Sequence, residues 1–267
     1  MIRDITIGQF YPAESIIHNI DARVKIIATF IYIITLFLIK DFIGLVFVGL
    51  MLAIVTKISK VPVKFMLKGI KGIFIIIILT SLINIFTIRD GMVIFEAGWI
   101  KITVPGVLTA LKIVIRLILL IMGSSLMTLT TTPIKLTDGI EYLLKPFRKI
   151  GVPAHDIAMM MTIALRFIPT LLDETDKIMK AQQARGADFE TGNLIQRAKS
   201  LVPILVPLFI SAFRRADDLA MAMEARCYSG NENRTRMNEM ILNNKDFIAI
   251  FLIFMYVLVI IAMRIFL

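Results

Sequence analysis

Residues 247–267 read FIAIFLIFMYVLVIIAMRIFL, a run of 21 residues in which Arg264 is the only charged side chain. An α-helix needs about 20 mostly apolar residues to cross the hydrocarbon core of a bilayer. The whole chain has the same character, because 58% of its 267 residues are hydrophobic and only 19% are charged. Soluble domains contain about 45–50% apolar residues. The excess must face lipid, so we predict an integral membrane protein.

Further apolar segments indicate the fold class, which is an all-α membrane protein with about five transmembrane helices plus long amphipathic cytoplasmic helices. Besides the C-terminal run, the predicted spans are Ile26–Ile39, Phe42–Thr56, Ile73–Ile88 and Val107–Thr130. The chain then divides into an N-terminal transmembrane region of four spans (1–130), a cytoplasmic arm (131–246) and a C-terminal transmembrane helix (247–267).

Lysine and arginine residues in the short loops predict the sidedness, since they are enriched on the cytoplasmic side of a membrane. The segment after the second span contains five lysines and no acidic residue, namely Lys57, Lys60, Lys64, Lys68 and Lys71. In the loop after the third span, the charges of two basic and two acidic residues cancel, so this loop has no net charge. We therefore expect residues 57–71 and the N-terminus inside the cell, residues 89–106 outside, the arm inside and the C-terminus outside, in a multi-pass protein of the cell membrane.

Two apolar patches interrupt the arm, Ile157–Leu172 and Leu201–Phe213. The first contains Arg166, whose charge is costly at the bilayer centre, and the second is too short to span alone. We expect both to belong to long helices along or beneath the membrane. A seven-span arrangement, in which both patches cross, leaves the termini on the same sides and stays open.

The arm contains a weak internal repeat with a period of 41 residues. Residues 171–186 read LLDETDKIMKAQQARG, and residues 212–227 read AFRRADDLAMAMEARC. Both units have a charged middle and an Ala-Arg ending, although two amphipathic helices of similar composition can also align by chance. Acidic residues in the first middle align with basic residues in the second, so that Asp173 and Glu174 could pair with Arg214 and Arg215 where the helices cross.

The endings of the two units are typical of helix C-termini. Gly186 suits the position after a helix, where the backbone becomes left-handed. Arg185 then lies in the last turn, where a positive charge favours the helix dipole and a guanidinium can still reach a partner's carboxylate or carbonyl groups. Two similar endings predict two similar binding sites on partners.

Taken in order, the motifs resemble those of a known family, the transmembrane T component of energy-coupling factor (ECF) transporters. The similarity covers nearly the whole chain and rests on Gly8–Pro12, Asp21–Lys25, Leu129–Pro133, Leu136–Glu141, Ala164–Pro169, Ser200–Pro203 and the two Ala-Arg endings. The second ending differs from the family, which commonly has glycine where this chain has Cys227. Because cysteine tolerates a left-handed backbone poorly, we expect the second helix to continue or to end differently, around residues 228–230.

The resemblance implies a transmembrane coupling subunit of an ATP-driven importer of vitamins or other micronutrients. Its expected partners are two ABC-type ATPase subunits (ECF A and A′), a membrane-embedded substrate-binding S component and the lipid bilayer. The residues expected to contact the ATPases are Ala184, Arg185, Gly186, Ala225, Arg226 and Cys227. Those expected to contact the S component or the other coupling helix are Leu201, Ile204, Leu205, Leu208 and Phe209.

Other functional classes find less support in the residues. One cysteine and two histidines are too few for a buried zinc or iron–sulfur site, so we expect no metal and no cofactor. No G-x-x-x-x-G-K-[ST] phosphate loop occurs, which predicts that the chain is not an enzyme and that partner subunits hydrolyse ATP. The +10 net charge reflects cytoplasmic loops rather than nucleic-acid binding. The alternative function is a stand-alone secondary transporter or channel, for which Lys112 and Arg116 are the candidate intramembrane charges.

Overall fold

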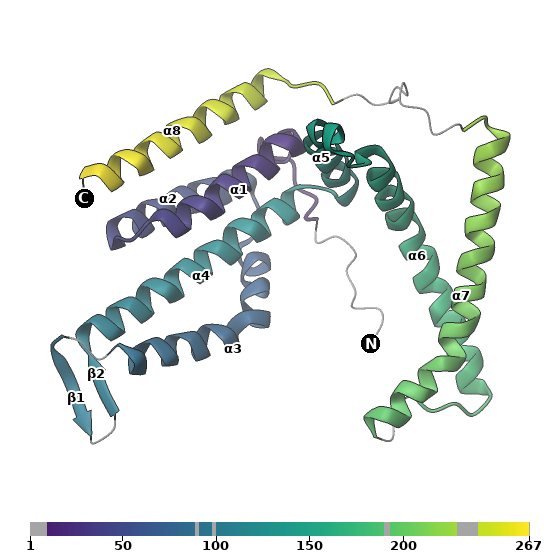
Figure 1. Ribbon diagram of the computed structural model, residues 1–267, viewed down its shortest axis with the longest axis horizontal. Helices are drawn as coiled ribbons and strands as arrows, with labels where there is room; N and C mark the ends of the chain where they lie inside the picture. The colour runs from purple at the N-terminus through teal and green to yellow at the C-terminus, as the bar shows by residue number, and fades with distance from the viewer. Residues whose placement is uncertain (1–9, 89–90, 98–99, 190–192, 229–239, 267) are drawn as a thin grey trace. The chain divides into compact units, whose positions relative to one another are not determined.

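The computed structural model describes residues 10–88, 91–97, 100–189, 193–228 and 240–266 (Figure 1). The motif residues Gly8 and Gln9 lie outside this set. The chain forms two compact units, one of Ile7–Ala154 with Ile241–Leu267, and one that contains His155–Met240. The first unit holds the helices α1 (Ala22–Leu38), α2 (Phe42–Ser59), α3 (Val63–Thr87), α4 (Val104–Thr130), α5 (Pro133–Leu144) and α8 (Asn244–Phe266), with a 3₁₀ helix, η2 (Lys145–Ile150).

Short polar side chains fix where several of these helices begin. The Asp21 carboxylate accepts a hydrogen bond from the Arg23 N–H at the start of α1. Thr103 accepts from the Gly106 N–H at the start of α4, and Thr132 accepts from the Lys135 N–H at the start of α5. Each bond satisfies a backbone donor that has no partner inside its helix.

A β-hairpin joins α3 to α4, formed by the antiparallel strands β1 (Val93–Ala97) and β2 (Ile100–Thr103). The sequence analysis treated residues 89–106 only as a loop and missed the hairpin. Its signal was present in two short runs rich in β-branched and aromatic residues on either side of a glycine.

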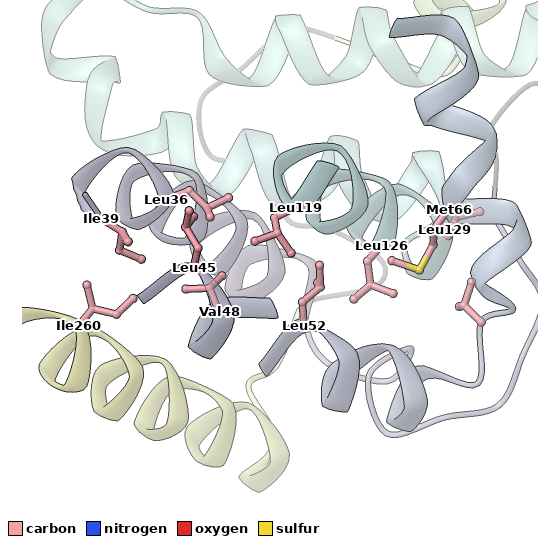
Figure 2. Packing of buried hydrophobic residues seen from close by; sticks show 11 residues of the cluster. Leu36, Ile39, Leu45, Val48, Leu52, Met66, Leu119, Leu126, Leu129 and Ile260 are labelled. Carbon is pink, nitrogen blue, oxygen red and sulfur yellow. The ribbon is translucent and has the colours of Figure 1, made fainter. Parts of the chain in front are cut away.

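The apolar core of the first unit lies where α1, α2, α4 and α8 run beside one another, with the start of α3 at one end (Figures 1 and 2). Its buried members are Leu36, Ile39, Leu45, Val48, Leu52, Val61, Met66, Leu119, Leu126, Leu129 and Ile260. The Tyr32 ring of α1 also lies against Gly123 of α4, and its hydroxyl donates to the Leu119 carbonyl at 2.8 Å. A glycine at position 123 is what allows α1 and α4 to approach this closely.

A network of polar groups ties the two ends of this unit together. The Asp246 carboxylate, 1% exposed, accepts from the Asp21 N–H at 2.8 Å and from the Asn243 N–H at 2.7 Å. The Lys25 ammonium group donates to the carbonyls of Thr130 (2.9 Å) and His18 (3.2 Å). Together these bonds join the start of α1, the end of α4 and the start of α8.

The buried ring of His18 completes the network. Its Nε2 lies 3.1 Å from the Tyr11 carbonyl, which can only accept, and its Nδ1 lies 2.7 Å from the Ser15 hydroxyl. A neutral ring with the proton on Nε2 satisfies both contacts. Burial lowers the pKa of His18 below its usual value. The hydrogen bond to Tyr11 raises the pKa and offsets part of this effect, whereas the nearby charge of Lys25 lowers it further. The ring is therefore neutral at pH 7.

Five described helices are long and apolar enough to cross a membrane, namely α2, α3, α4, α8 and, in the second unit, α6 (Ala154–Ala184). The predicted all-α membrane fold is confirmed, and so is the number five. The membership differs, however. At 17 residues α1 is not in this set, although the sequence analysis predicted a span at Ile26–Ile39. Helix α6, which the sequence analysis placed in the cytoplasmic arm, is in this set by length and composition and is the least apolar of the five.

The second unit consists mainly of α6 and α7 (Leu194–Ala225). A capping box starts α7, in which the side chains of Asn193 and Gln196 each bond to the other's backbone N–H. Proline occurs inside both helices, at Pro169 in α6 and at Pro203 and Pro207 in α7. Figure 1 shows α7 bending in its first half, where its two prolines lie.

We predict that Gly123→Ala destabilises the protein by about 1–3 kcal/mol, the usual cost of overpacking a core. The added Cβ would clash with Cε1 of Tyr32, whose hydroxyl bond to Leu119 resists displacement. The measurement is thermal unfolding of the full chain in detergent.

Gly72→Ala is the matched control, because its Cβ would meet no atom within 4 Å. Alanine suits a helix better than glycine by about 0.5–1 kcal/mol, so this variant should be as stable as the wild type or slightly more. Equal unfolding temperatures for the two variants would contradict the close contact between α1 and α4.

Candidate functional site: a helix crossing with two matched ends

Helices α6 and α7 are joined by an ion pair. Nη2 of Arg215 in α7 lies 2.9 Å from Oε2 of Glu174 in α6, and both side chains are only about a quarter exposed, at 28% and 25%. The side chain of Ser211, one turn before Arg215, also forms a hydrogen bond with Glu174. Of the pairs expected from the aligned charged middles, Glu174 with Arg215 is confirmed.

The same arginine contacts a second turn of α6. Its guanidinium carbon lies 5.7 Å from the ring centre of Phe167, within the range of a cation–π interaction. Because Phe167 and Glu174 are two helical turns apart on one face of α6, a single side chain of α7 fixes both the position of the crossing and the face that α6 presents.

The paired residues occupy equivalent positions in the internal repeat, since Glu174 and Arg215 are 41 residues apart. A contact between equivalent positions is expected where two similar units are related by an approximate two-fold axis. The crossing is therefore the point about which the two units of the repeat are arranged. From it, the C-terminal thirds of both helices lead to the Ala-Arg endings.

The two helix ends have the same hydrogen-bond pattern. At the end of α6, the Gly186 N–H donates to the Gln183 carbonyl (2.9 Å) and the Ala187 N–H to the Gln182 carbonyl (3.0 Å). These are the two bonds of a Schellman motif, which satisfies the free carbonyls of the last helical turn. At the end of α7, the corresponding bonds run from Cys227 to Glu224 (2.8 Å) and from Tyr228 to Met223 (3.0 Å).

The expectation that Cys227 changes the second ending is wrong. Helix α7 ends at Ala225, and Cys227 takes a left-handed backbone with φ of 58°, as Gly186 does with φ of 90°. A left-handed conformation costs a residue with a Cβ roughly 1–2 kcal/mol, and the two capping bonds offset this cost. Of the alternative end at residues 228–230, Ser229 and Gly230 lie outside the described residues.

All six residues of the paired endings are exposed, which leaves both arginines free to meet other proteins. These residues are Ala184, Arg185, Gly186, Ala225, Arg226 and Cys227. The structure places them at the ends of two helices, and it does not bring them together into one site. Figure 1 shows both C-terminal ends on the same side of the crossing.

The apolar set predicted on α7 is mostly uncovered in this chain. Ile204 is buried and Leu208 is half-buried, whereas Leu201, Leu205 and Phe209 are 45–60% exposed. The exposed surface is wider than the sequence analysis recognised, because it also includes Val202, Val206, Ile210 and Phe213. Such a large apolar surface is unusual on a water-facing helix and indicates contact with lipid or protein.

Arg116, a candidate intramembrane charge, binds the backbone instead. Its Nη2 donates to the Ile39 carbonyl at the end of α1, at 2.6 Å. This carbonyl lies just past the last turn of α1, where helical carbonyls have no internal partner. The contact gives Arg116 a structural role in holding α1 against α4.

Comparison with known proteins decides the family. The family model described as cobalt transport protein (CbiQ) matches residues 13–237. The energy-coupling factor transporter transmembrane protein EcfT of Clostridium kluyveri is 59% identical over 250 residues, which cover 93% of both chains. The EcfT protein of Thermosediminibacter oceani is 58% identical over 248 residues, 93% of both chains, and that of Bacillus subtilis is 44% identical over 246 residues, 92% of this chain and 93% of the relative.

The chain belongs to the EcfT family. The resemblance inferred from the motifs is thereby confirmed, and the chain is a transmembrane component of an energy-coupling factor transporter. As an EcfT protein with five apolar helices, it is a multi-pass membrane protein. The family match includes the crossing and both Ala-Arg endings.

We predict that exchanging the charges at the EcfT crossing preserves it. Glu174→Arg and Arg215→Glu should each destabilise the second unit, because each change brings two like charges into contact at positions 174 and 215. The double variant should recover most of the loss, with a coupling free energy of about 0.5–1 kcal/mol, typical of a partly exposed pair. A double-mutant cycle by thermal unfolding measures this coupling. Strictly additive effects would show that the two side chains do not interact.

Proposed function

We propose that this EcfT chain transmits movement from two cytoplasmic ATPases to a substrate-binding S component during ATP-driven uptake of a vitamin or other micronutrient. The observation that supports the proposal most is the pair of matched, exposed Ala-Arg endings on two helices that cross at equivalent positions of a repeat. Two equivalent endings suit two similar partners, as a pair of ATPase subunits would be.

Arg185 and Arg226 are the proposed anchors on the ATPases. The Schellman motif ends each helix abruptly, so the arginine side chain projects from a rigid helix end rather than from a loop. The neighbouring Ala184 and Ala225 have no bulk that would keep the helix end out of a groove. A planar guanidinium in such a groove can bind carboxylates or carbonyl oxygens with two parallel hydrogen bonds. Since the sequence has no phosphate-binding loop, ATP hydrolysis belongs to the partners.

The exposed apolar surface of α7 is the proposed contact with the S component, through Leu201, Leu205 and Phe209. An S component lies in the membrane, so apolar side chains are suited to meet it. With contacts to the ATPases at the helix ends and to the S component near the prolines of α7, the same helix would touch both partners. A change in the angle at the crossing would then move both contacts together.

The proposed orientation takes α1, α2, α3, α4 and α8 as the spans and keeps α6 in the cytoplasmic arm. It places residues 57–71 and the N-terminus inside the cell and the C-terminus outside. The five lysines of residues 57–71 support it, and it leaves the endings of α6 and α7 on the side where ATPases are found.

The proposal predicts that Arg185→Ala and Arg226→Ala each weaken assembly with the ATPases and transport, and that the double variant abolishes both. Truncating a hot-spot arginine costs about 2–4 kcal/mol because its partner's acceptors are left buried and unpaired. The measurements are substrate uptake and co-purification of the ATPases with the EcfT chain. Arg214→Ala is the matched control, since this exposed arginine of α7 lies three turns before the ending and should leave both readouts unchanged. Normal uptake by the double variant at normal expression would refute the role of the endings.

The orientation predicts a labelling pattern in intact cells on a Cys227→Ser background. Lys64→Cys should be protected from a membrane-impermeant thiol reagent, and Gly91→Cys, in the loop between α3 and β1, should react. Permeabilising the cells should expose position 64, which controls for burial. Labelling of position 64 from outside would reverse the proposed sidedness.

A further inference from the structure

The corner between α2 and α3, residues 57–71, concentrates half of the protein's net positive charge of +10 in one short segment. Its five lysines are all exposed, and the segment contains no acidic residue. Within the described part of the chain, none of these lysines forms an ion pair. Like charges this close repel one another, so the corner is suited to a polyanionic ligand that neutralises several of them at once.

Three of the lysines form a stripe on the first turns of α3. Lys64, Lys68 and Lys71 follow one another at intervals of four and three residues, which places them on one face of a helix. Met66 lies on the opposite face and is fully buried in the apolar core. The packing of Met66 therefore fixes the lysine face outward.

Apolar side chains on the same segment are exposed beside the lysines. Ile58, Val63, Phe65 and Leu67 are 42–48% exposed. Lys68 lies over the Phe65 ring, with its Nζ 5.9 Å from the ring centre. A surface that alternates apolar side chains and lysines fits neither bulk water nor hydrocarbon, but it fits the boundary between them, where lysine stems lie along acyl chains and ammonium groups reach the headgroups.

The course of α3 agrees with a position at this boundary. Figure 1 shows the first part of α3 turned away from the direction of the rest of the helix. Gly69 and Gly72 lie near the end of the lysine stripe, and glycine weakens a helix enough to allow a bend. Beyond them the exposed side chains are apolar up to the last residue of the helix, Thr87, beginning with Phe74, Ile75 and Ile76. The lysine stripe thus ends where the lipid-facing part of the helix begins.

We propose that the α2–α3 corner binds the headgroups of anionic phospholipids, with Lys64, Lys68 and Lys71 as the main ligands and Lys57 and Lys60 in support. Juxtamembrane clusters of four to eight basic residues attract anionic lipids, each lysine contributing to the affinity. The interleaved apolar residues and the direct continuation into the span favour lipid over an acidic protein surface, because acyl chains would cover the apolar residues while phosphates meet the lysines. This inference is independent of the proposed coupling role.

The test uses the full chain in detergent, titrated with mixed micelles that contain phosphatidylglycerol or phosphatidylcholine. Native mass spectrometry counts the lipids that stay bound, and the wild type should retain phosphatidylglycerol in preference. The triple variant Lys64→Gln, Lys68→Gln and Lys71→Gln should bind phosphatidylglycerol roughly 100-fold more weakly. The triple Lys→Arg variant at the same positions should keep the preference, since it keeps the charges.

A matched control removes the same charge elsewhere, by Lys135→Gln, Lys145→Gln and Lys149→Gln on α5 and η2, where all three lysines are exposed. This control should bind phosphatidylglycerol like the wild type. Equal retention of the two lipids by the wild type, or equal losses in the two glutamine triples, would overturn the proposal. If the first triple kept its lipid preference but lost the co-purifying ATPases, the corner would be a docking surface for protein and the lipid assignment would be wrong.

Discussion

The buried ammonium group of Lys25 is the interaction on which the arrangement of the first unit depends. It donates to the carbonyl of Thr130, the last residue of α4, and to that of His18 in the segment before α1. An unpaired charge in this position would cost several kcal/mol, so the two backbone segments are held where they can supply acceptors. Because Pro133 begins α5 three residues later, the same contact sets where the chain leaves α4.

Asp246 has the corresponding role for the other end of the chain. Its carboxylate accepts two backbone N–H groups, one of them from Asp21, 225 residues away. The contact fixes the start of α8 beside the start of α1, and the hydroxyls of Thr35 and Tyr256, 2.8 Å apart, join the same two helices further along. Helix α8 therefore does not rely on apolar packing alone, which is weakly directional between helices in lipid.

The sequence predicted best what depends on local patterns, and less well what depends on distant contacts. The spans of α4 and α8 were located to within a few residues, because an apolar run of more than 20 residues is seldom found outside a membrane. The start of α3 was placed ten residues too late, at Ile73 instead of Val63, since lysines lower hydropathy although lysine is a good helix former. The contacts of Lys25 and Asp246 were not found, because nothing in their spacing relates them to their acceptors.

The candidate site shows the same division. The pairing of Glu174 with Arg215 followed from the repeat, which is present in the sequence itself. The left-handed backbone of Cys227 did not follow from the sequence. Cysteine disfavours this conformation, but the two capping hydrogen bonds at the end of α7 stabilise it, as they do at the equivalent position of the repeat. The exposure of Leu201, Leu205 and Phe209 also had no sequence signal, since it depends on which surfaces of α7 another helix of this chain covers.

The place of the ion pair along the two helices also has a mechanical consequence. Glu174 and Arg215 each lie 11 residues before the arginine of their helix ending, about 16 Å along a helix. In the other direction, 20 residues separate Glu174 from the start of α6 and 21 separate Arg215 from the start of α7, about 30 Å. The crossing is thus the fulcrum of two levers with equal short arms and nearly equal long ones. If each helix turned as a rigid rod about the crossing, a displacement of either ending would become roughly twice as large at the opposite end. The effect would be smaller in α7, whose long arm bends in the part that contains Pro203 and Pro207.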